Sequence, residues 1–255
     1  RNKMKHTPRK RFGQNFLQDQ SIIRNIIECI NPLPEQNFIE IGPGLAALTK
    51  PLVEKLSHLE VIELDRDIVN FLQETFTPQQ LTIHQGDALK FDFTMNNKPI
   101  RVVGNLPYNI STPIMFYLSK FANIQNMVFM LQKEVVERIC AKPNNRDYGK
   151  LTIMLQYKYK CRYLLDVPPE SFYPAPKVDS AIVSLTPRND YDWHQVDETK
   201  LNHVVSKAFS QRRKTISNSL KGLFSSEQLI EAGIDPLLRP ENIELEKYIS
   251  LSKLI

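Results

Sequence analysis

Candidate binding residues follow four apolar runs of strand type in the first half of the chain. Gly42 and Gly44 follow the first run, Glu63 lies near the end of the second, and Asp87 and Asn105 follow the third and fourth. In a parallel sheet the carboxyl ends of strands share one edge, so these residues converge there. Glycines let the backbone approach a ligand, and a carboxylate accepts hydrogen bonds from two ribose hydroxyls. The set predicts a pocket for an adenosine, with its ribose on Glu63 and its adenine near Asp87.

Two kinds of adenosine ligand suit this pocket, a nicotinamide dinucleotide and S-adenosylmethionine. A dinucleotide site uses a third glycine to seat the pyrophosphate on the helix end, whereas this chain continues with Ala47 and Leu48. Glu40, inside the first run, would repel a pyrophosphate and tolerate a cationic amino acid and sulfonium. We therefore expect S-adenosylmethionine as the cofactor, and a nicotinamide-dependent oxidoreductase is the more distant alternative.

The segment 105–108 reads Asn-Leu-Pro-Tyr and directly follows the fourth run. A nucleobase exocyclic amine is a weak nucleophile because its lone pair is delocalised into the ring. The Asn105 side chain and a neighbouring backbone carbonyl can hold both amine hydrogens and aim the lone pair at a methyl group. Pro107 would fix the loop, and Tyr108 offers a face for stacking. No general base is required, since proton loss can follow methyl transfer, and the five histidines are scattered.

The elements that must position these residues indicate an α/β fold with a helical end. Amphipathic spacing predicts a helix over 21–30, before the first strand. Five strands alternate with helices up to 127–131, and two further strands are expected at 151–159 and 178–185. After Pro187 four short helical patterns follow, at 199–209, 214–223, 227–232 and 241–251. We therefore expect a catalytic domain over 1–187 and a helical RNA-binding or ribosome-binding domain over 188–255.

Composition excludes several classes of protein. The 255 residues are 42% hydrophobic and 24% charged, which is typical of a globular protein, and no apolar run reaches the length of a membrane span. The basic N-terminus lacks the apolar region of a secretory signal. Three cysteines without CxxC spacing argue for a reducing compartment and against structural zinc. We expect a cytoplasmic protein without a metal or membrane partner, and a monomer by default.

The net charge of +5 is concentrated in clusters of basic residues. A basic cluster binds nucleic-acid phosphates without regard to sequence, although such runs more often only solvate a surface. The helical region also contains acids, Glu227, Glu231 and Glu241, that could pair with its cations. The candidate RNA-binding residues are Arg9, Lys10, Arg11, Arg146, Lys150, Arg212, Arg213, Lys214 and Lys221.

Several motifs together resemble the ribosomal RNA adenine dimethyltransferase family. They occur in order at 14–17, 40–44, 63–65, 86–88, 105–111, 172–180 and 208–215. The resemblance implies a Rossmann-like S-adenosylmethionine-dependent methyltransferase sheet with a small all-helical C-terminal domain. It implies that Phe172 stacks on the target adenine, opposite Tyr108, and that Asn105 and Leu106 position the base. The cofactor-binding residues that it implies are Asn15, Leu17, Gly42, Gly44, Glu63, Asp87, Ala88 and Asn105.

Within the family the chain is most similar to bacterial members that act on 16S rRNA. The implied activity is dimethylation of two adjacent adenosines in a hairpin loop near the 3′ end of that RNA, within an immature small subunit. The alternatives are a 23S rRNA methyltransferase of the macrolide-resistance type and a non-catalytic assembly or transcription factor on the same fold. One position departs from the family pattern: Ala46 stands where Gly is common, which is tolerable if that residue is helical.

Overall fold

The computed structural model describes residues 15–255, so the predicted basic arm with Arg9, Lys10 and Arg11 lies outside the described residues. The chain forms two compact units. The first contains the chain up to Val136 together with Arg162–Thr186, and the second contains Glu137–Cys161 and Pro187–Ile255. No helix in the described part is long and apolar enough to cross a membrane.

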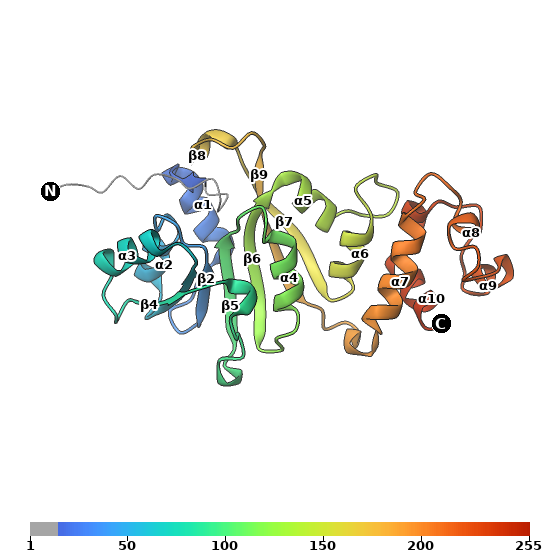
Figure 1. The fold of residues 1–255 in the computed structure, drawn as a ribbon, viewed down its shortest axis with the longest axis horizontal. Coiled ribbons are helices and arrows are strands. Elements are labelled where there is room, and N and C mark those ends of the chain that lie inside the picture. The colour runs from blue at the N-terminus through green and yellow to red at the C-terminus, as the bar shows by residue number, and fades with distance from the viewer. Residues whose placement is uncertain (1–14) are drawn as a thin grey trace. The chain divides into compact units, whose positions relative to one another are not determined.

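A seven-stranded sheet organises the first unit (Figure 1). Its strands, in spatial order, are β4 (Leu81–Gln85), β3 (Leu59–Glu63), β2 (Phe38–Ile41), β5 (Ile100–Asn105), β6 (Ile124–Gln132), β9 (Ser180–Pro187) and β7 (Tyr159–Val167). The strands from β4 to β6 run parallel, and β9 is antiparallel to β6. The predicted parallel sheet is therefore confirmed, and the carboxyl ends of β2, β3, β4 and β5 share one edge.

Three helices pack their apolar sides into one core against the sheet. These are α1 (Gln20–Ile30), α2 (Thr49–Lys55) and α3 (Arg66–Thr75), and the core includes Ile26, Leu52 and Leu72. The predicted helix over 21–30 corresponds to α1. Asp19 caps it by accepting hydrogen bonds from the first free N–H groups, which otherwise lack partners. A further helix, α4 (Ser111–Leu118), follows the loop after β5 and contacts the short 3₁₀ turn η2 (Ala88–Lys90).

A second, two-stranded sheet joins the segment just before α1 to a segment far along the chain. The strands β1 (Phe16–Leu17) and β8 (Phe172–Tyr173) pair antiparallel, with Leu17 opposite Phe172. The sequence gives no indication of this pairing, because each strand has only two residues. It joins two segments that the family resemblance places at the cofactor and the base.

One predicted strand is wrong. The segment 151–159 contains the helix α6 (Lys150–Gln156), and β7 begins only at Tyr159. The run Leu-Thr-Ile-Met-Leu is apolar without clear periodicity, which does not distinguish a buried strand from a buried helix. Here Thr152, Ile153, Met154 and Leu155 are all buried. The Thr152 hydroxyl accepts from the Gly149 N–H and donates to the Arg138 carbonyl, and these contacts fix the start of the helix.

The second unit is helical, as predicted, but its boundary differs from 188–255. Its helices after Pro187 are α7 (Glu198–Phe209), α8 (Ile216–Ser219), α9 (Ser226–Glu231) and α10 (Leu245–Ser252). Residues 137–161 belong to it as well, including α6 and the end of α5 (Lys133–Ile139). Tyr148 explains this grouping, because it is buried and its hydroxyl donates to the Ile243 carbonyl at 2.8 Å.

Candidate active site

A pocket opens at the carboxyl edge of the parallel strands, entirely within the first unit. Every candidate cofactor-binding and catalytic residue from the sequence lines it: Asn15, Leu17, Gly42, Gly44, Glu63, Asp87, Ala88, Asn105, Leu106, Pro107, Tyr108 and Phe172. Other residues also line it that were not among the predicted site residues: Phe16, Leu48, Met130, Gln132, Ser111 and Ser180. Phe16, Leu48 and Met130 are apolar, and Gln132 and Ser180 lie on β6 and β9. Only the folded structure shows that these residues reach the pocket.

The turn after β2 needs both glycines. Gly42 and Gly44 have φ angles of +66° and +54°, a region that side chains rarely adopt. A Cβ at Gly42 would lie 3.3 Å from the Asn105 carbonyl oxygen, and one at Gly44 would lie 3.2 Å from the Phe16 ring. The turn therefore lies close to the backbone of β5 at Gly42 and to the Phe16 ring of β1 at Gly44.

Ala46 does not have the helical conformation under which the sequence analysis accepted it. Its φ is +71°, and α2 begins only at Thr49. A left-handed conformation costs a residue with a side chain about 1–2 kcal/mol. The Ala46 methyl is fully buried in the apolar core, and this packing offsets part of that cost.

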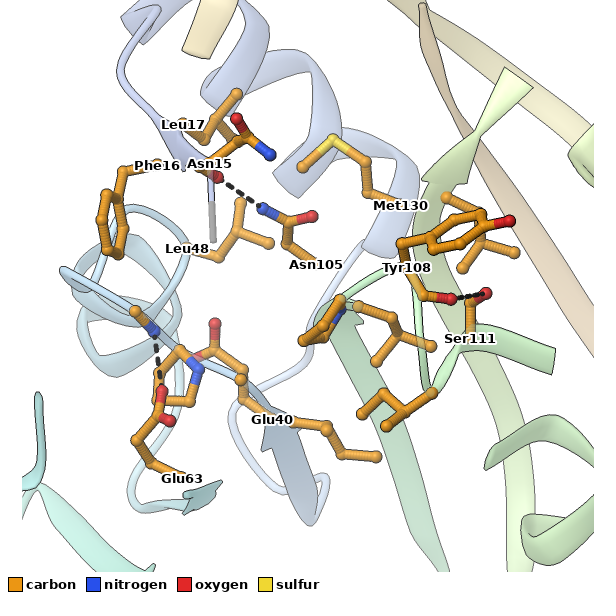
Figure 2. Close-up of a pocket in the computed structure, with 18 of the residues that line it drawn as sticks. Asn15, Phe16, Leu17, Glu40, Leu48, Glu63, Asn105, Tyr108, Ser111 and Met130 are labelled. Atoms are coloured by element: carbon orange, nitrogen blue, oxygen red, sulfur yellow. Dashed lines mark hydrogen bonds between the residues drawn. The ribbon is translucent and has the colours of Figure 1, made fainter. Parts of the chain in front are cut away.

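Glu63 is held rigidly at the end of β3. Its side chain is buried, Oε1 accepts from the Gly44 N–H at 3.4 Å, and Oε2 accepts from the Asp65 N–H at 3.0 Å. Burial raises the pKa of Glu63, and these backbone donors oppose the rise. Each carboxylate oxygen has further acceptor capacity, so the group can accept from ligand hydroxyls in the pocket (Figure 2).

Asp87 lies beyond β4, where the chain turns at Gly86. Its Oδ1 accepts from the Leu89 N–H at 2.9 Å, which forms an Asx turn, a local structural role that needs no ligand. Asp87 also lines the pocket, next to Ala88. The turn fixes the carboxylate at the pocket wall, and the two roles are compatible.

Asn105 is oriented by Asn15, the residue immediately before β1. Its Nδ2 donates to the Asn15 carbonyl at 3.4 Å (Figure 2). Within residues 15–255 no hydrogen bond to its Oδ1 is present. The amide is therefore anchored through its donor, and its acceptor oxygen is available to a ligand.

The loop after Asn105 is also ordered by hydrogen bonds. The Leu106 N–H donates to the Met130 carbonyl at 3.2 Å, and the Ile110 N–H donates to the Pro107 carbonyl at 3.2 Å. The Ser111 hydroxyl donates to the Tyr108 carbonyl at 3.1 Å (Figure 2). The Tyr108 side chain is 69% exposed at the pocket. The loop therefore presents the exposed aromatic ring of Tyr108 at the pocket.

Glu40 is not the fixed negative charge that the sequence predicted. Its carboxyl is buried and accepts a hydrogen bond from the Thr49 hydroxyl at 2.6 Å. The pKa of Glu40 is raised to about 8, mainly by burial; the Thr49 hydrogen bond opposes the rise and the nearby Glu63 adds to it. At pH 7 the side chain is mostly neutral in the free protein, so a fixed negative charge at Glu40 does not exclude a pyrophosphate.

The whole lining gives a better electrostatic argument. Three carboxyl groups, from Glu40, Glu63 and Asp87, line the pocket, and no Lys, Arg or His does so among the residues described. A pyrophosphate would find no cationic partner there. A ligand with an ammonium and a sulfonium would find acidic partners. The residues present therefore fit S-adenosylmethionine. Residues 15–255 contain no cluster of side chains that could hold a metal ion.

The described candidate RNA-binding residues lie in the second unit, and one of them has a structural role. Arg146, Lys150, Arg213, Lys214 and Lys221 are exposed. Arg212 instead donates from Nη2 to the carbonyls of residues 146 and 148, at 2.6 and 2.7 Å, and pairs with the carboxylate of residue 241 at 3.4 Å. Arg212 therefore joins the loop before α6 to the C-terminal helices.

Comparison with known proteins supports the same interpretation. The family model described as ribosomal RNA adenine dimethylase matches residues 5–255. A Chromobacterium violaceum protein named ribosomal RNA small subunit methyltransferase A is 53% identical over 97% of this chain and 95% of its own length. A Legionella pneumophila protein of the same name is 54% identical over 99% of each.

Solved structures share the fold at lower identity. A dimethyladenosine transferase from Plasmodium falciparum has a TM-score of 0.80 and 24% identity, covering 92% of this chain and 95% of that one. The 23S rRNA methyltransferase ErmE has a TM-score of 0.75 and 24% identity, covering 94% of this chain and 98% of that one. With the family model matching nearly the whole sequence, the chain belongs to the ribosomal RNA adenine dimethylase family.

Proposed function

We propose that this protein uses S-adenosylmethionine to dimethylate the exocyclic amines of two adjacent adenosines in a hairpin loop near the 3′ end of 16S rRNA. The proposal assigns the donor to the acidic half of the pocket and the target base to the loop after β5. The curated relatives with more than 50% identity, which are named as small-subunit methyltransferases, support the choice of RNA.

The observation that carries the proposal is the anchored amide of Asn105. Its Nδ2 is engaged by the Asn15 carbonyl, and Oδ1 remains to accept one hydrogen of an adenine amine. In the loop that follows, the carbonyls of Pro107 and Tyr108 already accept hydrogen bonds, whereas that of Leu106 accepts none from the described residues. The Asn105 side chain and the Leu106 carbonyl are therefore the pair that would hold both amine hydrogens.

Two aromatic residues would hold the base between them. Tyr108 is exposed at the pocket and Phe172 lines it from β8. Stacking between aromatic faces is worth about 1–3 kcal/mol per base and tolerates any sequence. Bases in an RNA loop are already partly unstacked, so bringing one into the pocket costs less than flipping it out of a duplex.

The donor would be held by the residues at the ends of β2, β3 and β4. Glu63 would accept from the ribose hydroxyls, Asp87 would accept from the adenine amine, and the backbone at Gly42 and Gly44 would approach the ligand closely. When bound, S-adenosylmethionine supplies an electrophilic methyl group. The protein's contribution is to orient the amine towards it and to exclude water, and the proton can leave to solvent afterwards.

Two other functions are weaker. A 23S rRNA methyltransferase would share the fold, but the resemblance to ErmE is 24% in sequence and concerns the fold alone. A non-catalytic assembly or transcription factor would have no need of an anchored Asn105 or of a complete acidic pocket. The proposed setting is an immature small ribosomal subunit in the cytoplasm, with the protein acting as a monomer.

The test is incubation of the protein with radiolabelled S-adenosylmethionine and three separate substrates. These are isolated immature small subunits, large subunits and naked 16S rRNA, with the labelled nucleotides mapped afterwards by nuclease digestion and mass spectrometry. We expect dimethyladenosine at two adjacent positions in the small-subunit RNA. Label in 23S rRNA alone would support the first alternative, and donor binding without transfer to any substrate would support the second.

A further inference from the structure

Glu40 is a buried carboxyl group that the proposed chemistry does not use. It lies in the middle of β2, where it is 1% exposed, and it also lines the pocket. Thr49, at the start of α2, donates its hydroxyl to Oε1 at 2.6 Å. Figure 2 shows Glu40 between Glu63 and Asn105, which are the residues assigned to the donor ribose and to the target amine. With the donor held as proposed, a group in this position would face the part that joins its ribose to its transferable methyl.

The charges around Glu40 do not neutralise a carboxylate. Its neighbour on β3 is the acid Glu63, its partner from α2 is the neutral Thr49, and the site residue at the end of β5 is the neutral Asn105. Asp87 adds a third acid from the segment after β4. On the adjacent strand, Arg101 donates instead to the carbonyls of residues 30 and 31 and to the side chains of residues 36 and 126. Lys50 on α2 is exposed.

An isolated carboxylate buried beside another acid is costly, so the free protein holds Glu40 in its protonated form. Burial accordingly raises the pKa of Glu40 to about 8. A cationic ligand reverses this balance, because an opposite charge nearby favours the ionised form. Neither the fold nor the Thr49 contact has to change, since Oε1 accepts from the Thr49 hydroxyl in both protonation states.

We propose that Glu40 is the charge partner of the cationic portion of S-adenosylmethionine, and that donor binding is coupled to release of the Glu40 proton. The O–H bond of the carboxylic acid breaks, the proton goes to the buffer, and the carboxylate that remains faces the cation. The pocket thereby distinguishes a cationic donor from neutral adenosine compounds. This inference rests on the proposed donor.

The coupling makes donor affinity depend on pH in a defined direction. Below the pKa of the free protein, binding must remove a proton, and this cost falls as pH rises. Donor affinity should therefore increase by up to tenfold per pH unit between pH 6 and about pH 7.5, where the free protein is still mostly protonated. A ligand with the same adenosine and no positive charge should not gain affinity from Glu40.

The test is isothermal titration calorimetry at pH 7 in buffers of different ionisation enthalpy, which counts the protons exchanged on binding. The ligands are S-adenosylmethionine and 5′-methylthioadenosine, which has the same adenosine and a neutral thioether. We expect most of one proton to be released with the first ligand and far less with the second. Glu63 also has a raised pKa, but both ligands contain the ribose, so a proton from Glu63 would appear with both.

The variant Glu40→Gln keeps an oxygen for Thr49 and mimics the protonated acid. It should bind the donor without releasing the proton and without the rise of affinity with pH. Thr49→Val is a second variant: loss of the hydroxyl should move the midpoint of proton release to higher pH. Equal release with both ligands, release that persists in Glu40→Gln, or an unchanged midpoint in Thr49→Val would overturn the inference. Failure of S-adenosylmethionine to bind at all would instead contradict the proposed function.

Discussion

Glu63 and Asn105 are two polar side chains whose positions are fixed by contacts that leave acceptor oxygens available. Backbone N–H groups at Gly44 and Asp65 hold the first, and the Asn15 carbonyl holds the second. Each side chain therefore loses little conformational freedom when a ligand binds, because the protein has already ordered it. This preorganisation allows separate predictions for the donor and the acceptor.

Glu63→Ala should weaken donor binding by tenfold or more. The variant loses hydrogen bonds from the ribose hydroxyls to a charged acceptor, and each is worth about 1.5–3 kcal/mol. Titration calorimetry with S-adenosylmethionine measures the change, and circular dichroism checks that the variant is folded. Glu54→Ala, which removes an exposed acid on α2, serves as the control. Unchanged affinity in folded Glu63→Ala would contradict the ribose assignment.

Asn105→Ala should fold and bind RNA but lose methyl transfer. Removing one well-placed electrostatic contact to a transition state costs roughly 10²–10³ in rate. Single-turnover kinetics with labelled donor and immature small subunits measure the loss, and a separate titration shows how much comes from weaker donor binding. A single-turnover rate near that of the parent would remove Asn105 from the acceptor site.

Side-chain identity and strand order were enough to bring Gly42, Gly44, Glu63, Asp87 and Asn105 to one edge of the sheet, where they line the pocket, but not to give the state of every residue there. Glu40 was expected to act as a negative charge, whereas its burial depends on α2 and β3, whose packing the sequence does not specify. Ala46 was expected to be tolerable on the condition that it is helical, since Leu45 and Leu48 have a helical spacing. In the structure that spacing belongs to a turn, and Ala46 is left-handed.

Among secondary-structure elements, the close contact between β2 and β5 has a direct consequence for stability. At Gly104, next to Asn105, an added Cβ would lie 2.3 Å from the Ile41 carbonyl oxygen, which is backbone and cannot move away cheaply. Gly104→Ala should therefore lower the free energy of unfolding by about 1–3 kcal/mol, the range for overpacking.

Urea denaturation followed by circular dichroism measures this change. Lys98→Ala, an exposed substitution just before the same strand, is the control and should stay within about 0.5 kcal/mol of the parent. A Gly104→Ala protein as stable as that control would mean that β2 and β5 do not approach each other as described.

The five parallel strands were predictable because each is a short apolar run that ends at a polar or glycine turn. The helix α6 was not, because its four consecutive buried residues, 152–155, leave no alternation of polar and apolar positions to reveal a helical period. The pairing of β1 with β8 joins residues more than 150 positions apart through two-residue strands. Only tertiary structure brings such segments together.

At the level of the whole molecule, the change from strands to helices after Pro187 indicated a second unit but not its full extent. Residues 137–161 belong to it because Tyr148 and Thr152 bond within that unit. Arg212 makes the same connection from the other side, through the carbonyls of residues 146 and 148. Arg212, although part of a basic cluster, thus stabilises the fold. The pattern of charges in the sequence does not distinguish such a residue from one that contacts phosphate.

This distinction decides how the predicted RNA contacts are tested. Arg213, Lys214 and Lys221 are exposed, and no ion pair of theirs is present within residues 15–255. Replacing all three by alanine should weaken binding to the ribosomal substrate and reduce its dependence on salt. The loss in slope should be about two to three units, at about 0.7–0.9 for each phosphate contact. Arg212 is left in place, because its removal would disturb the loop before α6.

Filter binding to immature small subunits across a series of salt concentrations measures that slope, and donor titration should remain unchanged. The control variant replaces Lys55, Lys98 and Lys120, three exposed lysines of the first unit, and removes the same total charge. Because phosphate contacts act locally through counterion release, only the cluster in the second unit should change the slope strongly. An equal effect of both variants would mean that net charge alone governs binding. An unchanged slope in the first variant would mean that these side chains only solvate their helices.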